Sequence, residues 1–94
     1  MSGPKAARAA RQIHVFYNGR VQGVGFRFTA ETTAVALRLT GWVRNLRNGR
    51  VEAVLEGPEP KLQAFLQDMR TGPMANFIRD VEVTEARAGK RSGD

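Results

Sequence analysis

The sequence of 94 residues contains no cysteine, which excludes disulfide bonds, cysteine-ligated zinc sites and catalytic thiols. No apolar run approaches the roughly 20 residues that a membrane-spanning helix needs. The N-terminal stretch MSGPKAARAARQ also lacks the apolar segment of a secretory signal. We therefore expect a cytoplasmic protein that forms one small domain and has no membrane partner.

Acidic residues are missing from the first third of the chain. The first one is Glu31, whereas five basic residues precede it: Lys5, Arg8, Arg11, Arg20 and Arg27. The basic and acidic side chains that follow almost cancel, and the net charge of the whole sequence is +6. A positive segment attracts anions, and charge alone fits a small phosphate compound as well as a nucleic acid.

Hydrophobic periodicity predicts the order strand, helix, strand, strand, helix, strand. The strands are expected at residues 13–18, 40–45, 50–56 and 78–85, the first helix at about 27–39, and the second between GPEP and TGP. Asn48-Gly49 is expected to supply the positive φ angles of a hairpin turn between the second and third strands. Two sets of residues are expected to be buried: Phe26, Ala30, Ala34, Leu37, Leu62, Phe65, Leu66 and Met69 on the helices, and Ile78, Val81 and Val83 on the last strand.

Both helical stripes need a single sheet face to cover them, which predicts an α+β fold of the ferredoxin-like split βαβ type (βαββαβ). Its four-stranded antiparallel sheet would carry both helices on one face. Residues 12–86 are expected to form this domain, preceded by a disordered basic arm at 1–11 and followed by a polar tail at 87–94. His14 is expected on the open face of the sheet, and Arg44, Arg47 and Arg50 on a solvated basic face near the hairpin.

The stretch GRVQGVGFR, residues 19–27, places three glycines between a predicted strand and a predicted helix. Glycines allow successive backbone N–H groups to point into one concavity, and the helix N-terminus favours an anion there. Arg27 would add a forked pair of charge-assisted hydrogen bonds. A phosphate site is one interpretation, and a flexible connector with solvated arginines is the other. The stretch lacks the Lys-Ser/Thr ending of a nucleotide-binding P-loop, which disfavours a nucleotide.

Three motifs taken together resemble the acylphosphatase family: GRVQGVGFR, then GWVRNLRNGRVEAVLEG, then GP before the second helix. The resemblance runs from about Val15 to Val83. It implies a ferredoxin-like fold and an enzyme that hydrolyses the carboxyl–phosphate bond of small acyl phosphates. It also implies that no metal and no organic cofactor takes part, and that inorganic phosphate is the product and an inhibitor. We expect a monomer.

The resemblance also implies roles for individual residues. Arg27 would bind the phosphate group, and Asn45 would orient the attacking water. The phosphate-binding loop would be formed by Gly19, Arg20, Val21, Gln22, Gly23, Val24 and Gly25. From the residues alone, Gln22 is expected to brace the loop through side-chain hydrogen bonds, and Arg20 to make a structural contact or reach solvent.

An RNA-binding module is the alternative, because RNA-recognition domains share the predicted strand order and the chain is basic. Such domains place aromatic residues on the central strands to stack bases. The third strand here, RVEAVLE, carries two glutamates and no aromatic residue. Nucleic acid is therefore not the expected partner.

Overall fold

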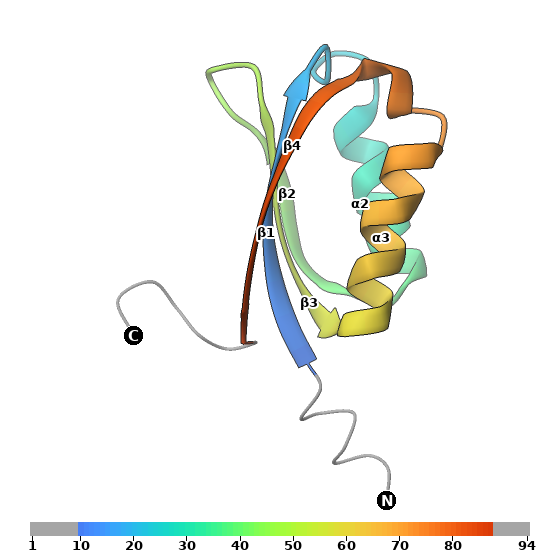
Figure 1. The fold of residues 1–94 in the computed structure, drawn as a ribbon. Coiled ribbons are helices and arrows are strands. Elements are labelled where there is room, and N and C mark those ends of the chain that lie inside the picture. The colour runs from blue at the N-terminus through green and yellow to red at the C-terminus, as the bar shows by residue number, and fades with distance from the viewer. Residues whose placement is uncertain (1–9, 88–94) are drawn as a thin grey trace, which may run out of the picture.

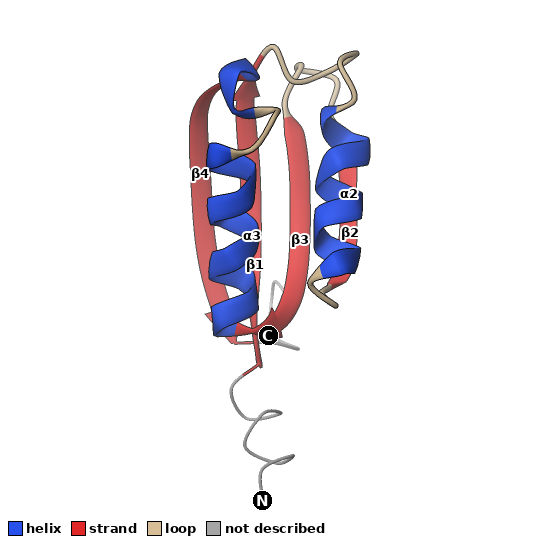
Figure 2. Ribbon diagram, turned by 90° about the vertical axis from the view of Figure 1, so that its right-hand side faces the viewer, coloured by secondary structure: helices blue, strands red, loops and turns tan. Residues whose placement is uncertain are grey.

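The computed structural model describes residues 10–87, which form a four-stranded antiparallel sheet with two helices on one of its faces (Figures 1 and 2). The strands lie in the order β2-β3-β1-β4. The elements are β1 (Ala10–Gly19), α2 (Phe26–Ala36), β2 (Thr40–Asn45), β3 (Val51–Pro58), α3 (Glu59–Thr71), the short 3-10 helix η1 (Ala75–Phe77) and β4 (Ile78–Arg87). The predicted α+β ferredoxin-like fold is confirmed.

The core lies between the sheet and the two helices. Alternate residues of β1 point to the helices, and Ile13, Val15 and Tyr17 are each at most 1% exposed. The predicted helical stripes meet them there, with these side chains buried: Phe26, Ala30, Ala34, Leu62, Phe65, Leu66 and Met69. Side-chain alternation in strands and a period near 3.6 in helices explain why this core could be predicted from the sequence.

The sheet extends beyond both predicted boundaries of the domain. Arg11 pairs with Gly57 on β3 and with Arg87 on β4, so the sheet begins two residues before the predicted start of the domain and ends one residue after its predicted end. Backbone pairing on both sides of β1 outweighs the weak strand preference of these residues. The rest of the predicted arm and tail, residues 1–9 and 88–94, lies outside the described residues.

The first helix ends three residues before its predicted end. Arg38 has a left-handed backbone with φ 61°, and its amide donates to the carbonyl of Val35. The amide of Leu39 donates to the carbonyl of Ala34. This pair of reversed hydrogen bonds is the Schellman motif, which closes a helix end. Leu39 is thereby turned into the core, where it is 7% exposed.

The hairpin between β2 and β3 differs from the predicted one. Gly49 has φ 93°, but Asn48 does not have a positive φ. Instead, the Oδ1 atom of Asn48 accepts a hydrogen bond from the amide of Arg50 at 3.0 Å. An Asx turn of this kind replaces one backbone turn conformation by a side-chain contact. The prediction of two positive φ angles was therefore wrong for Asn48.

The last strand is less buried than predicted. Ile78 and Val81 are partly buried against the core, but Val83 is 39% exposed. Val83 pairs with Val15 and so faces the side of the sheet that the helices cover. Because β4 is an edge strand, its outer positions lie beyond the helices. The burial predicted for Val83 was wrong for this reason.

Candidate active site

The connection from β1 to α2 is a loop with two glycines in left-handed conformations. Gly23 has φ 79° and Gly25 has φ 87°. A Cβ atom at either position would meet no other atom within 4 Å. Glycine is therefore favoured at both positions by the backbone conformation and not by crowding.

The N-terminus of α2 opens onto this loop and has no side-chain cap. No side chain accepts a hydrogen bond from the first turn, and no acidic residue lies in that turn. Gly25 is the N-cap residue, and its carbonyl accepts the first helical hydrogen bond, from Thr29 at 3.0 Å. The free amides of a first helical turn and the positive end of the helix dipole together favour an anion.

A cavity of about 190 Å³ lies at this point of the structure. Its lining joins the loop, the start of α2 and the end of β2: Val21, Gly23, Gly25, Phe26, Arg27, Phe28 and Asn45. Arg27 and Asn45 are eighteen positions apart in the sequence, and the fold brings them to the same cavity. Arg27, Asn45 and the first turn of α2 thus border one small volume.

Two larger hollows lie elsewhere on the described part of the molecule. One of about 250 Å³ lies where α2 meets the end of α3, and one of about 220 Å³ lies between α2 and β2. The residues that line them include no arginine or lysine. The smaller cavity is therefore the better candidate for an anion.

Four of the predicted phosphate-binding residues line the cavity, namely Val21, Gly23, Gly25 and Arg27, together with the predicted catalytic Asn45. Four others do not line it: Gly19, Arg20, Gln22 and Val24. Sequence reasoning missed Phe26 and Phe28 as lining residues. Their place in the first turn of the helix is the signal that points to them, because that turn presents its amides to the loop.

Gly19 and Arg20 fasten the loop to the segment before β4. The amide of Arg20 donates to the carbonyl of Phe77 at 2.9 Å. A Cβ atom at Gly19 would lie 2.2 Å from the same carbonyl oxygen, so only glycine fits there. The amide of Arg20 is thus already used in this structure, and the expected structural contact of Arg20 is made by its backbone.

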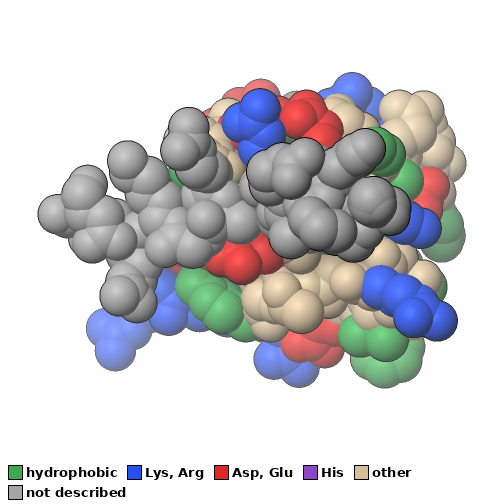
Figure 3. All heavy atoms as spheres, turned by 90° about the horizontal axis from the view of Figure 1, so that it is seen from below, with side chains coloured by type: hydrophobic (Ala, Val, Ile, Leu, Met, Phe, Trp, Pro, Cys, Tyr) green, Lys and Arg blue, Asp and Glu red, His purple; other side chains and the backbone are tan. Residues whose placement is uncertain are grey.

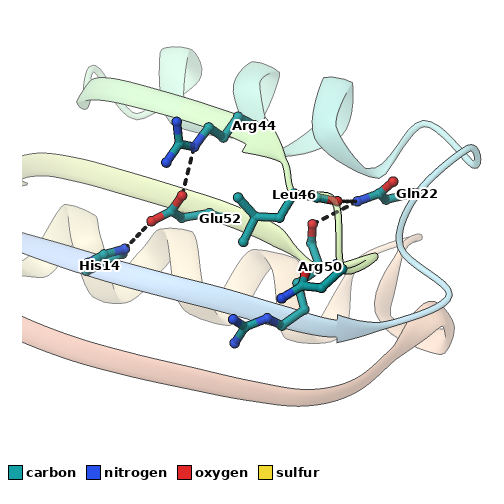
Figure 4. Close-up of polar contacts among 7 residues, drawn as sticks. His14, Gln22, Arg44, Leu46, Arg50 and Glu52 are labelled. Atoms are coloured by element: carbon teal, nitrogen blue, oxygen red, sulfur yellow. Dashed lines mark hydrogen bonds and ion pairs between the residues drawn. The ribbon is translucent and has the colours of Figure 1, made fainter.

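Gln22 braces the loop as expected. Its Nε2 atom donates to the carbonyls of Leu46 at 2.7 Å and Arg50 at 2.9 Å. Figure 4 shows the Gln22 side chain reaching from the loop to these two carbonyls of the β2–β3 connection. The loop and the hairpin are thereby joined directly beside Asn45.

The two predicted catalytic side chains belong to regular secondary structure and are exposed to solvent. Arg27 lies in the first turn of α2, and its side chain is 54% exposed. Its Nε atom lies 3.9 Å from Oε2 of Glu31, a loose pair one helical turn away. Asn45 is the last residue of β2 and shares the helix-facing side of that strand with the buried Val43. Alternation along the strand therefore directs Asn45 toward the start of α2.

A polar cluster lies on the opposite face of the sheet, and its member Arg44 directly precedes Asn45 in the chain. The Glu52 carboxylate accepts hydrogen bonds from Arg44 and His14, as Figure 4 shows. Burial alone would raise the pKa of Glu52, but these two hydrogen bonds and the charges behind them hold it below its ordinary value of 4.5. His14 is on the open face, as predicted, but it is paired there.

The arginines near the hairpin are not simply solvated. The Arg44 guanidinium lies over the ring of Trp42, 4.8 Å from its centroid, and that of Arg50 lies over the ring of Phe16 at 4.4 Å. Such cation–π contacts hold long side chains against an aromatic surface. The Arg44 side chain is still 62% exposed, as expected for a solvated basic face, whereas that of Arg50 is only 29% exposed.

The uncovered face of the sheet carries the aromatic rings of Trp42 and Phe16, but these rings lie under the guanidinium groups of Arg44 and Arg50 respectively. The same face carries the carboxylates of Glu52, Glu56, Asp80 and Glu82, which oppose a phosphate backbone. At the end of the molecule away from the loop, both basic and acidic side chains are in view among hydrophobic ones (Figure 3). These surfaces argue against the RNA-binding alternative.

Neither a metal-binding cluster nor a membrane-spanning helix is found within residues 10–87. No group of three or more His, Cys, Asp or Glu side chains in this range is arranged to hold a metal ion. Within the same residues, no helix combines the length and apolar character needed to cross a membrane.

The fold and the cavity together define a small α+β protein with a candidate anion site at a helix N-terminus. The sequence model of the acylphosphatase family matches residues 13–94. An acylphosphatase from Trichormus variabilis is 51% identical over 72 residues, which cover 77% of this chain and 71% of that protein. The chain belongs to the acylphosphatase family and is a hydrolase.

Solved structures agree with this assignment. The crystal structure of acylphosphatase from Bacillus subtilis has a TM-score of 0.77 and 43% sequence identity, over 83% of this chain and 87% of that chain. The structure of an acylphosphatase from Coxiella burnetii has a TM-score of 0.81 and 33% identity, over 98% and 95% of the two chains.

Proposed function

We propose that this protein hydrolyses the carboxyl–phosphate bond of small acyl phosphates at the cavity between the loop, α2 and β2. The phosphoryl oxygens are held by the Arg27 guanidinium and by the amides of the loop and the first turn of α2. The Asn45 carboxamide places a water in line with the phosphorus–oxygen bond to the acyl group. The bond from water to phosphorus forms as the carboxylate leaves with the bonding electron pair, and the proton that the water gives up passes to a phosphoryl oxygen of the product phosphate.

The observation that carries this proposal is that Arg27 and Asn45 border the same cavity as an uncapped helix start. A transferring phosphoryl group spreads its charge over three oxygens, so positioning and charge stabilisation supply most of the catalysis. A planar guanidinium can donate two parallel hydrogen bonds to two of those oxygens. The amides then remain for the third oxygen.

The chemistry of the leaving group fits a site without an evident general acid. The acyl group leaves as a carboxylate, whose conjugate acid has a pKa of roughly 4 to 5 by analogy with side-chain carboxyls. Such a group departs without being protonated. An amide is a poor base, so Asn45 acts by orienting the water through its donor and its acceptor.

The donors that surround the cavity also support a reaction without a metal ion or organic cofactor. A guanidinium and backbone amides repel a cation and attract the phosphate itself. Inorganic phosphate, the product, presents the same oxygens as the substrate. It should therefore compete with the substrate for Arg27 and the amides.

The proposed partners are limited to substrate and product, with the protein acting as a monomer in the cytoplasm. Exposed large apolar residues are spread over the loop, α2, β2 and β4: Val24, Phe28, Val35, Trp42 and Val83. Val35 and Trp42 line the same hollow between α2 and β2, whereas Val83 lies on the opposite edge strand, so the five residues do not form one continuous patch. This supports a monomer, because stable interfaces gather such residues into one patch. A charged acyl phosphate does not cross a bilayer unaided, which supports action in the compartment where it is made.

The test is hydrolysis of benzoyl phosphate by the purified protein in the presence of a chelator, with p-nitrophenyl phosphate as the comparison. Selective hydrolysis of the acyl phosphate, inhibited competitively by inorganic phosphate, is the expected result. Equal hydrolysis of both compounds, or turnover that stops with the chelator, would contradict the proposal. Light scattering on the same sample checks the monomer.

A further inference from the structure

Gln22 uses both donor hydrogens of its side-chain amide within the protein. The Nε2 atom carries two hydrogens, and they meet two acceptors, the carbonyl oxygens of Leu46 and Arg50 at 2.7 and 2.9 Å. The remaining polar atom of the side chain, Oε1, is an acceptor and cannot bind a phosphate oxygen. The side chain of Gln22 therefore supplies no donor to a phosphate group, and any phosphate binding by Gln22 is left to its backbone amide.

The two carbonyls that Gln22 binds are those that close the hairpin. The carbonyl of Leu46 also accepts from the amide of Gly49 at 3.1 Å, and that of Arg50 from the amide of Leu46 at 2.8 Å. Leu46 directly follows Asn45 in the chain. Gln22 thus holds the hairpin at the peptide next to the residue proposed to orient water.

The loop has separate attachments on its other side. Arg20 is bound to Phe77, and the Val21 side chain is 1% exposed in the core. Gly23 and Gly25 lack side chains, and Val24 is exposed. Among the described loop residues, Gln22 provides the two hydrogen bonds that connect the loop with the β2–β3 connection.

We propose that Gln22 is a positioning residue, which fixes the distance between the phosphate-holding loop and the Asn45 carboxamide. The inference rests on the proposed role of Asn45. Without the two hydrogen bonds, the loop and the start of α2 still hold phosphate, but the hairpin moves relative to them. The water then spends less time in line with the bond to be broken, and small misplacements of reacting groups are costly.

The test compares Gln22→Met, which keeps the length of the side chain but lacks its donors, with wild type. We expect kcat for benzoyl phosphate to fall about tenfold, while the Kd of inorganic phosphate changes by less than about twofold. Amide hydrogen exchange at Leu46 and Gly49 should become faster. Gln12→Met, at a half-buried position of β1 remote from the cavity, is the matched control and should leave kcat unchanged.

A double-mutant cycle separates positioning through Asn45 from a general loss of structure. In an Asn45→Ala background, Gln22→Met should lower the residual kcat by no more than about twofold. Gln22→Asn, which is one methylene too short to reach both carbonyls, provides the same comparison if Gln22→Met does not fold.

Three outcomes would overturn the inference. They are an unchanged kcat in Gln22→Met, a loss of phosphate affinity as large as the loss of kcat, and full additivity with Asn45→Ala. The proposed water-orienting role of Asn45 is tested separately. If that role is wrong, Asn45→Ala alone keeps its turnover.

Discussion

The Nε atom of Arg44 donates to Oε1 of Glu52 at 2.8 Å, which ties β2 to β3 one residue before Asn45. Only 6% of Glu52 is exposed, whereas the side chains of its partners Arg44 and His14 are 62% and 43% exposed. A carboxylate in such a place is stable in its charged form only while it is hydrogen-bonded. The contact therefore makes the stability of the sheet depend on the charge of Glu52.

Acid should weaken this protein through Glu52. Because the folded-state pKa of Glu52 lies below its ordinary value of 4.5, ionisation stabilises the fold above that value. The stabilisation is lost as the pH falls through the lower folded-state pKa. Glu52→Gln should lower the free energy of unfolding by about 1 kcal/mol near neutral pH, since the partners are screened by solvent. Urea unfolding between pH 7 and pH 3 measures both effects.

Glu82→Gln is the control for this prediction, because Glu82 is exposed and lies 3.9 Å from its partner Arg50. Its unfolding profile should follow that of the wild type closely. If Glu52→Gln keeps the full acid dependence of the wild type, Glu52 is not the group responsible.

Replacement of Arg27 should remove both phosphate binding and turnover. In Arg27→Ala, we expect kcat/KM to fall by about 100-fold or more, because the main charge that faces the phosphoryl oxygens is lost. The free energy of unfolding should change by less than about 0.5 kcal/mol, since the side chain is half-exposed and loosely paired. Calorimetry with inorganic phosphate and steady-state kinetics provide the measurements.

Arg70→Ala removes the same charge from the exposed end of α3 and should leave both binding and turnover near wild type. Phosphate binding that persists in Arg27→Ala would assign the anion to another group.

Replacement of Asn45 should separate turnover from binding. Asn45→Ala should lower kcat by about 100-fold or more, as is typical when one well-placed donor is lost. The affinity for inorganic phosphate should stay within about twofold of wild type, because Arg27 and the amides remain. Asn76→Ala, an exposed asparagine of η1, is the matched control. Near-normal turnover in Asn45→Ala would show that another group orients the water.

Removal of one hydroxyl should stabilise the core. Tyr17 is 1% exposed, and its hydroxyl oxygen has no hydrogen-bond partner among residues 10–87. Burial raises the pKa of Tyr17 far above its ordinary value of 10, so the ring stays neutral. Tyr17→Phe keeps the edge-on contact with Phe26 and should raise the free energy of unfolding by about 1 kcal/mol. Urea unfolding measures the change, and a decrease would mean that the hydroxyl is satisfied in solution.

The sequence was sufficient for those features that depend on local pattern. Alternation in β1 and the stripes of α2 and α3 identify the buried faces, and these faces admit one arrangement of the sheet. The family motif added Arg27 and Asn45, which periodicity does not relate to each other. Their shared cavity then follows from the strand order.

The features that were missed depend on partners distant in the sequence. Nothing in the residues around Arg20 indicates that its amide donates to the carbonyl of Phe77, because Phe77 lies near the other end of the domain in the sequence. The pairing of Glu52 with Arg44 and His14 likewise depends on the register of three strands. The hairpin turn was misjudged because the Asn48 side chain competes with the backbone for the same hydrogen bond.

The contact between Gly19 and Phe77 makes the order of assembly relevant to catalysis. The base of the loop is shaped by a carbonyl that the chain supplies only after both helices and three of the four strands have been made. A nascent or refolding chain that has not yet docked β4 lacks this support, however much of its sheet has formed. The appearance of activity thus marks the completion of the fold.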